Sequence, residues 1–291
     1  MTEQYGSIEA GGTKFVLAIG NKNLEIMERI SIPTSTPSET IPKIIEFFKK
    51  FNVCAIGLGC FGPIDLKKDS PTYGYITNTP KIDWQMFDIV GVLEKELAVP
   101  ILFTTDVNAA CYGEYVAGAA KGLSSCVYYT IGTGIGAGAM NMGEFVEGFS
   151  HPEMGHMIVR KVEADTYEGN CPFHRDCLEG LAAGPAIEKR TGIKGQEMGQ
   201  DDPTWDFVAD YLAQAIYNTT LILSPEKIIL GGGVIKQPQL LPKIKEKFKQ
   251  LLNEYVSYPH IDEYLVLPTL GDNPGTIGCL ALAKKKQTLS N

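Results

Sequence analysis

Apolar and polar positions along the chain predict alternating strands and helices, beginning with three strands in a row. A Gly-Gly turn at residues 11–12 joins the first two strands. The expected strands cover residues 5–10, 15–19, 24–32, 53–59 and 100–104, and amphipathic helices cover 38–51 and 86–97. Three strands followed by alternating helices and strands are typical of an α/β fold with a mixed sheet.

A second copy of this pattern begins near residue 125. The strand at 125–131 is followed by four glycines at alternate positions within 132–138, which favour a turn between two strands. No amphipathic helix follows them, so they do not form a dinucleotide-binding glycine loop. Further helices are predicted over 203–223, 240–256 and 279–285, and a strand over 227–230. Each half opens with a strand and a Gly/Thr turn, which indicates an internal repeat.

Composition excludes several classes of protein. The 291 residues are 44% hydrophobic and 21% charged, as in ordinary globular proteins, and the net charge of -8 argues against a nucleic-acid partner. No apolar run has the length of a membrane span, and the N-terminus lacks a secretory signal pattern, so no membrane association is expected. Seven cysteines, without the short chain of a disulfide scaffold, favour the reducing cytoplasm.

A predicted metal site lies between residues 156 and 177. His156, Cys171, His174 and Cys177 have the spacing H-x14-C-x2-H-x2-C. Four nitrogen and sulfur ligands are the closed set of a structural zinc site. The alternative is that the cysteines are buried apolar side chains and the histidines belong to a surface loop. Glu153 and Glu179 flank the ligands, where a bound metal would fix them as acceptors for the hydroxyl groups of a polyol.

Glycine-rich turns offer candidate phosphate sites. The turn Gly11-Gly12-Thr13-Lys14 presents backbone N–H groups to an anion, although an ordinary hairpin turn explains it equally well. A similar turn at Thr133-Gly134 would clamp a polyphosphate from the other half of the chain. The run that contains Gly232 and Gly233 leaves room for a flat ring, or is a plain turn between a strand and a helix.

Asp106 follows the strand at 100–104 and precedes a helix rich in alanine. Aspartate is a favoured helix N-cap, which is the structural interpretation. The functional interpretation is a general base at the carboxyl end of a strand, where open α/β sheets bind ligands. Position alone does not separate the two.

The motifs together resemble the ROK family of sugar kinases and repressors. The resemblance covers residues from about 4 to 282 and rests on E-A-G-G-T-K, C-F-G-P-I-D, T-D-V-N-A, I-G-T-G-I-G-A-G, E-M-G-H, C-P-F-H-x-x-C-L-E and I-L-G-G-G-V. The form C-P-F-H-x-x-C resembles that of the family's zinc-containing bacterial fructokinases. Members with a repressor function carry a helix-turn-helix before the kinase-like core, and here the first strand begins at about residue 5.

This resemblance implies an actin-like ATPase (ribonuclease H-like) fold with two α/β domains flanking an active-site cleft. The first domain would comprise residues 1–117 plus 275–291, because the terminal helix packs back on it in the family. The second would comprise residues 118–274 and carry the zinc-binding loop. The family also implies a homodimer.

The resemblance implies roles for individual residues as well. Asp106 would be the catalytic base. The sugar would contact Gly62, Asn78, Thr105, Asp106, Glu153, His156 and Glu179. ATP would contact Gly11, Gly12, Thr13, Lys14, Thr133, Gly134, Gly232 and Gly233. Glu9 stands where many relatives have an aspartate that helps to hold Mg²⁺ through water, and Thr105 stands where many have asparagine, which bears on sugar preference.

The expected activity is ATP-dependent phosphorylation of fructose at its 6-hydroxyl, with Mg²⁺ as cofactor and Zn²⁺ in a structural role. A kinase of the same family for glucose, mannose or N-acetylmannosamine is the first alternative. A sugar-binding protein without catalysis is the second.

Overall fold

The computed structural model describes residues 3–290 and divides into two compact units. Unit 1 runs to Gly122 and also takes in Phe145–His151 and the chain from Thr269 onward; unit 2 comprises Leu123–Glu144 and Pro152–Pro268. The boundaries lie a few residues from those expected at 117/118 and 274/275. The sequence pattern gave no sign that residues 145–151 pack with unit 1.

Unit 1 is built on a five-stranded sheet of order β3-β2-β1-β4-β7. Its strands are β1 (Gln4–Ala10), β2 (Lys14–Asn21), β3 (Ile26–Pro33), β4 (Val53–Cys60) and β7 (Ile101–Thr105). The first three strands pair antiparallel through the predicted hairpin, whereas β1, β4 and β7 run parallel. The expected mixed sheet is therefore confirmed.

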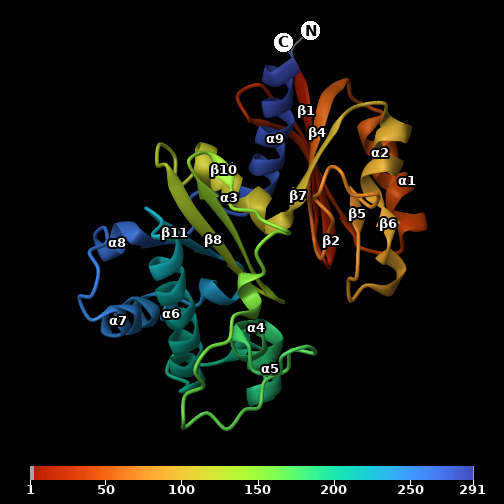
Figure 1. The fold of residues 1–291 in the computed structure, drawn as a ribbon. Helices are drawn as coiled ribbons and strands as arrows, with labels where there is room; N and C mark the ends of the chain where they lie inside the picture. Colours follow the sequence, from red (N-terminus) through yellow and green to blue (C-terminus); the bar gives the residue numbers. More distant parts are fainter. Residues whose placement is uncertain (1–2, 291) are drawn as a thin grey trace. The chain divides into compact units, whose positions relative to one another are not determined.

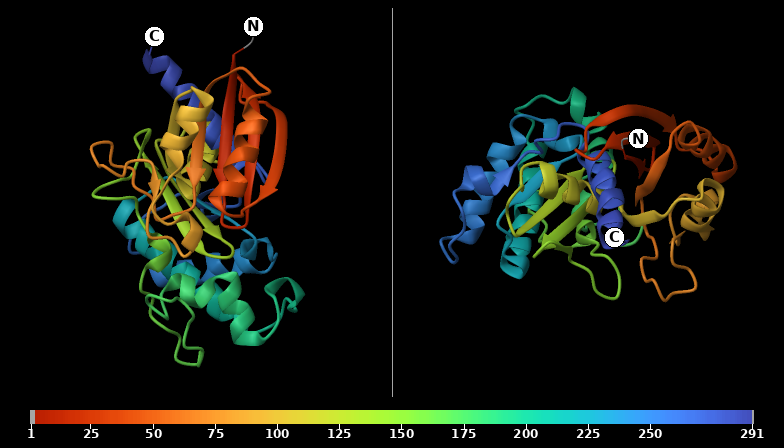
Figure 2. Two further views of the ribbon diagram at one scale, coloured as in Figure 1. Left: turned by 90° about the vertical axis from the view of Figure 1, so that its right-hand side faces the viewer. Right: turned by 90° about the horizontal axis from the view of Figure 1, so that it is seen from above.

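Helices cover both faces of this sheet (Figure 1). Helices α1 (Pro37–Phe48) and α2 (Ile89–Leu97) lie on one face, and α3 (Asp106–Ala117) and α9 (Pro274–Ser290) lie on the other. Side chains of β1 point alternately to the two faces of the sheet and therefore contact both helix layers. Ile8 packs on the α1 side, while Tyr5 packs with Leu280 of α9. Both views in Figure 2 place α9 alongside β1. The terminal helix thus packs back on unit 1, as expected.

Close backbone contact allows α9 to lie on the sheet. A Cβ atom added to Gly57 of β4 would lie 2.0 Å from the carbonyl oxygen of Cys279, so only glycine fits there. Helix α9 begins at Pro274, earlier than the predicted residue 279. Proline suits a first helical position, because its fixed φ is already helical and the missing N–H would have no partner there.

Unit 2 has a second five-stranded sheet, of order β10-β9-β8-β11-β12. Its strands are β8 (Ser125–Ile131), β9 (Ile135–Asn141), β10 (Glu144–Phe145), β11 (Ile228–Gly231) and β12 (Leu265–Val266). Its helices are α4 (Leu178–Ala182), α5 (Gly184–Thr191), α6 (Thr204–Leu223), α7 (Leu240–Leu252) and α8 (Ile261–Tyr264). The β8–β9 hairpin confirms the strand pair predicted around the alternating glycines.

Short elements complete the fold. A two-stranded ribbon, β5 (Tyr75–Ile76) with β6 (Phe87–Asp88), occupies part of what the sequence pattern assigned to a helix over 86–97. That helix begins only at Ile89, because the Asp88 carboxylate accepts a hydrogen bond from the Gly91 amide at 2.8 Å and caps it. Within residues 3–290, no helix has the length and apolar character needed to cross a membrane.

Candidate active site and metal cluster

Three of the predicted site segments meet at one edge of the unit 1 sheet. Ala10, Cys60 and Thr105, the last residues of β1, β4 and β7, are neighbours in register. The Gly11–Lys14 turn, Gly62 and Asp106 each follow one of these strand ends. Topology therefore gathers them at the carboxyl edge of parallel strands, where ligands bind in open α/β sheets.

Asp106 is the first residue of α3 and is not its cap. The Thr105 hydroxyl accepts a hydrogen bond from the Asn108 amide at 3.0 Å and caps the helix instead. The alternative that Asp106 is a helix N-cap is therefore wrong. Its half-buried carboxylate accepts from the adjacent Val107 amide at 2.8 Å. Thr105 is 4% exposed, so its hydroxyl serves the helix start.

The Gly11–Lys14 turn is held from both sides and stays exposed at its tip. Gly11 donates to the Lys14 carbonyl at 3.0 Å, and the Thr34 hydroxyl donates to the Gly11 carbonyl at 2.7 Å. Gly12 and Thr13 are exposed, so their amides are open to an anion. The turn has the geometry of a small, fixed anion site.

Glu9 lies in β1, two residues before the first glycine of this turn. Burial raises the pKa of its carboxyl, and the Thr276 hydroxyl at 3.3 Å and the charges of Arg29 and Lys14 oppose that rise. A buried carboxylate of this kind gains from a nearby divalent cation, because the cation offsets the cost of removing its charge from water. Glu9 thus fits the Mg²⁺ role that the family resemblance implies.

Gly62 and Asn78 are held close together in unit 1. The Thr77 amide and hydroxyl both donate to the Pro63 carbonyl, at 2.8 and 3.0 Å. This contact fixes the segment after β4 against the segment after β5. Asn78 is exposed and Gly62 is half-buried, so both can reach a ligand.

Two of the predicted nucleotide residues of unit 2, Thr133 and Gly233, line one cavity of about 440 Å³. Gly134 and Gly232 are their chain neighbours and are not part of its lining. Gly132 at the β8–β9 turn accepts a hydrogen bond from the Gly184 amide at 2.8 Å, which ties the turn to the start of α5. Gly232 has a φ of +94°, and a Cβ atom there would lie 2.3 Å from the Ile131 carbonyl oxygen.

Sequence reasoning missed most of this cavity wall. The added lining residues include Gly184, Pro185, Lys194, Gln196, Trp205 and Gln237. Gln237 donates to the Gly195 carbonyl at 2.9 Å and holds the loop after α5 in place. Neither glutamine belongs to a motif, so their contribution is decided by tertiary contact.

The four predicted metal ligands form one cluster in unit 2. Their donor atoms lie within 4.8 Å of one another. Nδ1 of His156 lies 3.6 Å from Sγ of Cys171 and 3.5 Å from Sγ of Cys177, and Nδ1 of His174 lies 3.7 Å from Sγ of Cys171. A tetrahedron with Zn–S and Zn–N bonds of about 2.3 and 2.1 Å has nitrogen–sulfur edges of about 3.6 Å. The donor set therefore fits Zn²⁺.

Backbone contacts shape the loop that carries these ligands. Cys171 and Arg175 exchange hydrogen bonds at 3.1 and 3.0 Å, which closes a tight turn around His174. Arg175 has a φ of +57°, in the left-handed region. Leu178 donates to the Met157 carbonyl at 2.9 Å and joins the two ends of the loop. Only a turn of this kind lets C-x2-H-x2-C place three donors on one centre.

Glu179 connects the predicted metal cluster to the predicted nucleotide turn at residues 133–134. It lies on α4, two residues after Cys177, and its Oε2 accepts a hydrogen bond from the Ile135 amide at 2.9 Å. The same oxygen would lie 2.7 Å from a Cβ atom added to Gly134. Glu153 precedes the short helix of residues 154–156, where its carbonyl accepts from the His156 amide at 3.0 Å. The sequence did not indicate the contact of Glu179 with the turn.

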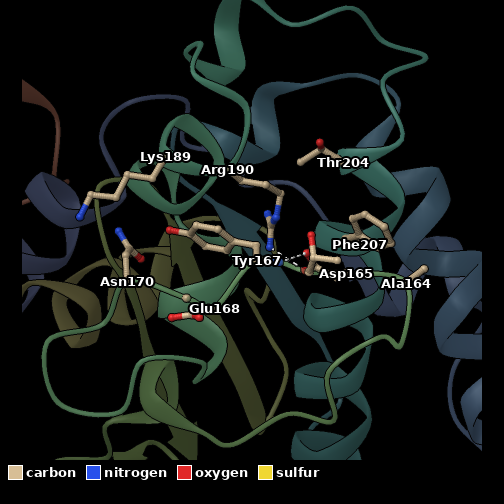
Figure 3. Close-up of a pocket in the computed structure, with 11 residues that line it drawn as sticks. Ala164, Asp165, Tyr167, Glu168, Asn170, Lys189, Arg190, Thr204 and Phe207 are labelled. Atoms are coloured by element: carbon tan, nitrogen blue, oxygen red, sulfur yellow. Dashed lines mark hydrogen bonds and ion pairs between the residues drawn. The ribbon is translucent and has the colours of Figure 1, made fainter.

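A buried ion pair also stabilises the loop that carries the predicted metal ligands (Figure 3). Arg190 of α5 donates to Asp165 at 2.9 Å, and the two side chains are 8% and 2% exposed. Asp165 also accepts from the Tyr211 hydroxyl at 2.7 Å, and Arg190 from α5 reaches the Leu181 carbonyl of α4 at 3.0 Å. The Tyr167 ring covers the guanidinium, 4.7 Å from its centroid, beside a cavity of about 670 Å³. The pair links the ligand loop to three helices.

Replacing Arg190 with methionine is expected to lower the free energy of unfolding by about 3–5 kcal/mol, because it leaves the Asp165 carboxylate buried without its cation. Urea denaturation measures this loss. The control is Arg175→Met, which removes an exposed pair with Glu168 and should cost about 1 kcal/mol or less. Equal losses in the two variants would contradict the structural role of the buried pair.

The chain is similar to known proteins in both sequence and structure. The sequence pattern that defines the ROK family matches residues 5–286. A fructokinase of Streptococcus mutans is 49% identical, with 98% of this chain and 99% of that protein aligned. A fructokinase of Lactococcus lactis subsp. cremoris is 52% identical, with 97% and 98% aligned.

Solved structures agree with these matches. A ROK hexokinase from Thermus thermophilus superposes with a TM-score of 0.82 and 25% identity, over 99% of each chain. A ROK family glucokinase from Streptomyces griseus, solved with glucose and AMPPNP, superposes with a TM-score of 0.73 and 22% identity, over 98% of this chain and 100% of that one.

Proposed function

This chain belongs to the ROK family, and we propose that it transfers the γ-phosphoryl group of ATP to the 6-hydroxyl of fructose. Its fold is the actin-like ATPase (ribonuclease H-like) fold that was expected. The observation that carries the proposal is identity near 50%, over almost the full chain, with relatives named fructokinase. We would not expect a protein that catalyses a different reaction to share this level of identity over almost its whole length.

Asp106 is the proposed general base. Its carboxylate stands at the carboxyl edge of the sheet, at the start of α3, and is half-buried. As the 6-hydroxyl attacks the γ-phosphorus, Asp106 would accept the hydroxyl proton, while the bond between the γ-phosphorus and the oxygen of ADP breaks. Phosphoryl transfer depends mostly on positioning and charge neutralisation, so one well-placed base suffices.

For the sugar, we propose the contacts that the family resemblance implies. They are Gly62 and Asn78, held together through Pro63, and also Glu153, His156 and Glu179. Because Nδ1 of His156 points at the cluster sulfurs, its Nε2 remains for a sugar hydroxyl.

For ATP, we propose the contacts that the family resemblance implies. Gly11 to Lys14 would hold phosphate through exposed amides, as would Thr133 and Gly134, and Gly232 and Gly233 would lie near the adenosine. Mg²⁺, when bound, would neutralise charge on the phosphates, and Glu9 would hold it through water. Zn²⁺ would be structural, held by His156, Cys171, His174 and Cys177.

A kinase for another hexose is the second candidate. A glucokinase of Halalkalibacterium halodurans is 27% identical over 97% of this chain, so the family serves other sugars. We also propose that the protein is a cytoplasmic homodimer. None of its seven cysteines forms a disulfide, which supports a reducing compartment; the dimer is implied by the family resemblance alone. Light scattering after gel filtration would test the assembly.

A coupled ADP-release assay with MgATP tests the function. The purified protein is assayed with fructose, mannose, glucose and N-acetylmannosamine side by side. We expect the highest kcat/KM with fructose. A preference for another sugar would overturn the fructose assignment, and ADP release with none of them would overturn the kinase assignment.

A further inference from the structure

Lys81 lies against the Gly11–Lys14 turn, although the two are far apart in the sequence. A Cβ atom added to Gly12 would be 3.6 Å from Cε of Lys81, which is ordinary van der Waals contact. The end of the lysine side chain therefore lies beside Gly12 at the exposed tip of the turn, and the ammonium nitrogen is bonded to this carbon. Both partners belong to unit 1, so this contact lies within a single compact unit.

The position of Lys81 is fixed by Trp84. The Trp84 amide donates to the Lys81 carbonyl at 2.9 Å, which closes one turn of helix. The buried Trp84 indole donates to the Ser35 carbonyl at 2.7 Å and stacks on Phe15 at 5.4 Å. Phe15 is the second residue of β2, directly after the turn. One aromatic anchor thus holds the lysine segment against the strand that follows the turn.

The charge of Lys81 is not taken up by a neighbouring acid. Among residues 3–285, whose side chains the structure describes, Lys81 forms no ion pair, whereas Lys243 and Lys245 each pair with an aspartate at 2.7 and 2.8 Å. Lys81 is half-buried, so its side chain loses conformational entropy. No ion pair with a carboxylate offsets this loss. A cation kept beside exposed backbone amides is a site for an anion with several oxygens.

We propose that Lys81 is a further catalytic residue, whose ammonium group contacts the phosphoryl group during its transfer. The inference rests on the proposed kinase function. Charge spreads over the three outer oxygens of the phosphoryl group as it moves, and fixed donors aimed at those oxygens stabilise it. Lys81 donates hydrogen bonds and keeps its protons. The proton of the sugar hydroxyl goes to Asp106, and ADP leaves with the electrons of the broken bond.

The same segment also carries Asn78, the proposed sugar contact, three residues before Lys81. The Gln85 side chain donates to the Thr79 carbonyl between them at 2.8 Å, so both residues stand on one rigid piece of chain. A sugar bound to Asn78 would therefore steady Lys81 as well. Loss of Lys81 should lower kcat far more than it raises KM for the sugar.

The test compares Lys81→Met and Lys81→Arg with the wild type. We expect kcat of Lys81→Met to fall by ~10²-fold, the scale for losing one fixed donor to a charged transition state, with KM for fructose changed by less than about threefold. Lys81→Arg should recover at least about tenfold of that loss, because it restores the charge. Inhibition by aluminium fluoride with MgADP and fructose, which mimics the group in transfer, should weaken in parallel with kcat.

Lys68→Met is the matched control, since Lys68 is an exposed lysine of the same long loop; its kcat should stay within twofold. Melting curves must show that Lys81→Met is folded. If the wild type is active and Lys81→Met has a near-normal kcat, the role of Lys81 is overturned while the proposed function stands. A wild type that phosphorylates none of the four sugars would overturn the proposed function, and this inference with it.

Discussion

Replacing Asp106 with asparagine is expected to lower kcat by at least ~10²-fold, the usual cost of losing a general base. The amide is nearly the same size and can still accept the hydrogen bond that the Val107 amide gives to Asp106. The start of α3 should survive as well, because Thr105 caps it. The variant should therefore fold and bind fructose while failing to accept the hydroxyl proton. Steady-state kinetics and fructose binding by calorimetry separate these effects.

Asp88→Asn is the control for that experiment. It makes the same chemical change in the same unit, at the cap of α2, a helix that carries none of the proposed site residues. Its kcat should remain within about twofold of the wild type, because asparagine is as good an N-cap as aspartate. A kcat of Asp106→Asn near the wild-type value would contradict the assignment of Asp106 as the base.

Removal of metal from the cluster is expected to lower both stability and activity. Without an ion, the two thiols and two imidazoles no longer hold the loop, and α4 with Glu179 loses its fixed start. The hydrogen bond from Ile135 to Glu179 would then hold the nucleotide turn less firmly. A loss of about 3–5 kcal/mol, a modest part of a structural zinc ion's binding energy, lowers Tm by about 10 °C in a protein of this size.

Chelation followed by calorimetry and kinetics measures this effect. KM for ATP should rise along with the fall in Tm, and added Zn²⁺ should restore both. Cys177→Ser should reproduce the chelated state, whereas Cys54→Ser, which changes an exposed cysteine outside the cluster, should leave metal content and Tm unchanged. An unchanged Tm in metal-free protein would contradict the structural role of the metal.

Local sequence determined most of the longer strands and helices of this protein and the identity of its candidate metal ligands. Alternating and continuous apolar runs define strands β1 to β4, β7, β8 and β11, because a buried strand needs little beyond its own side chains and its turns. The spacing of Cys171, His174 and Cys177 limits these residues to one tight turn, so three donors were evident without coordinates. The role of Asp106 as base was suggested by family resemblance, since local chemistry allowed a cap equally well.

Tertiary structure decided the contacts between segments distant in sequence. That Glu179 binds the Ile135 amide and that Lys81 lies against Gly12 both follow from the packing of separate elements. Hydrophobic patterning specifies which face of a strand or helix is buried, and it does not specify which polar groups meet once those faces pack. Such pairs depend on register and crossing geometry, which only the folded chain defines.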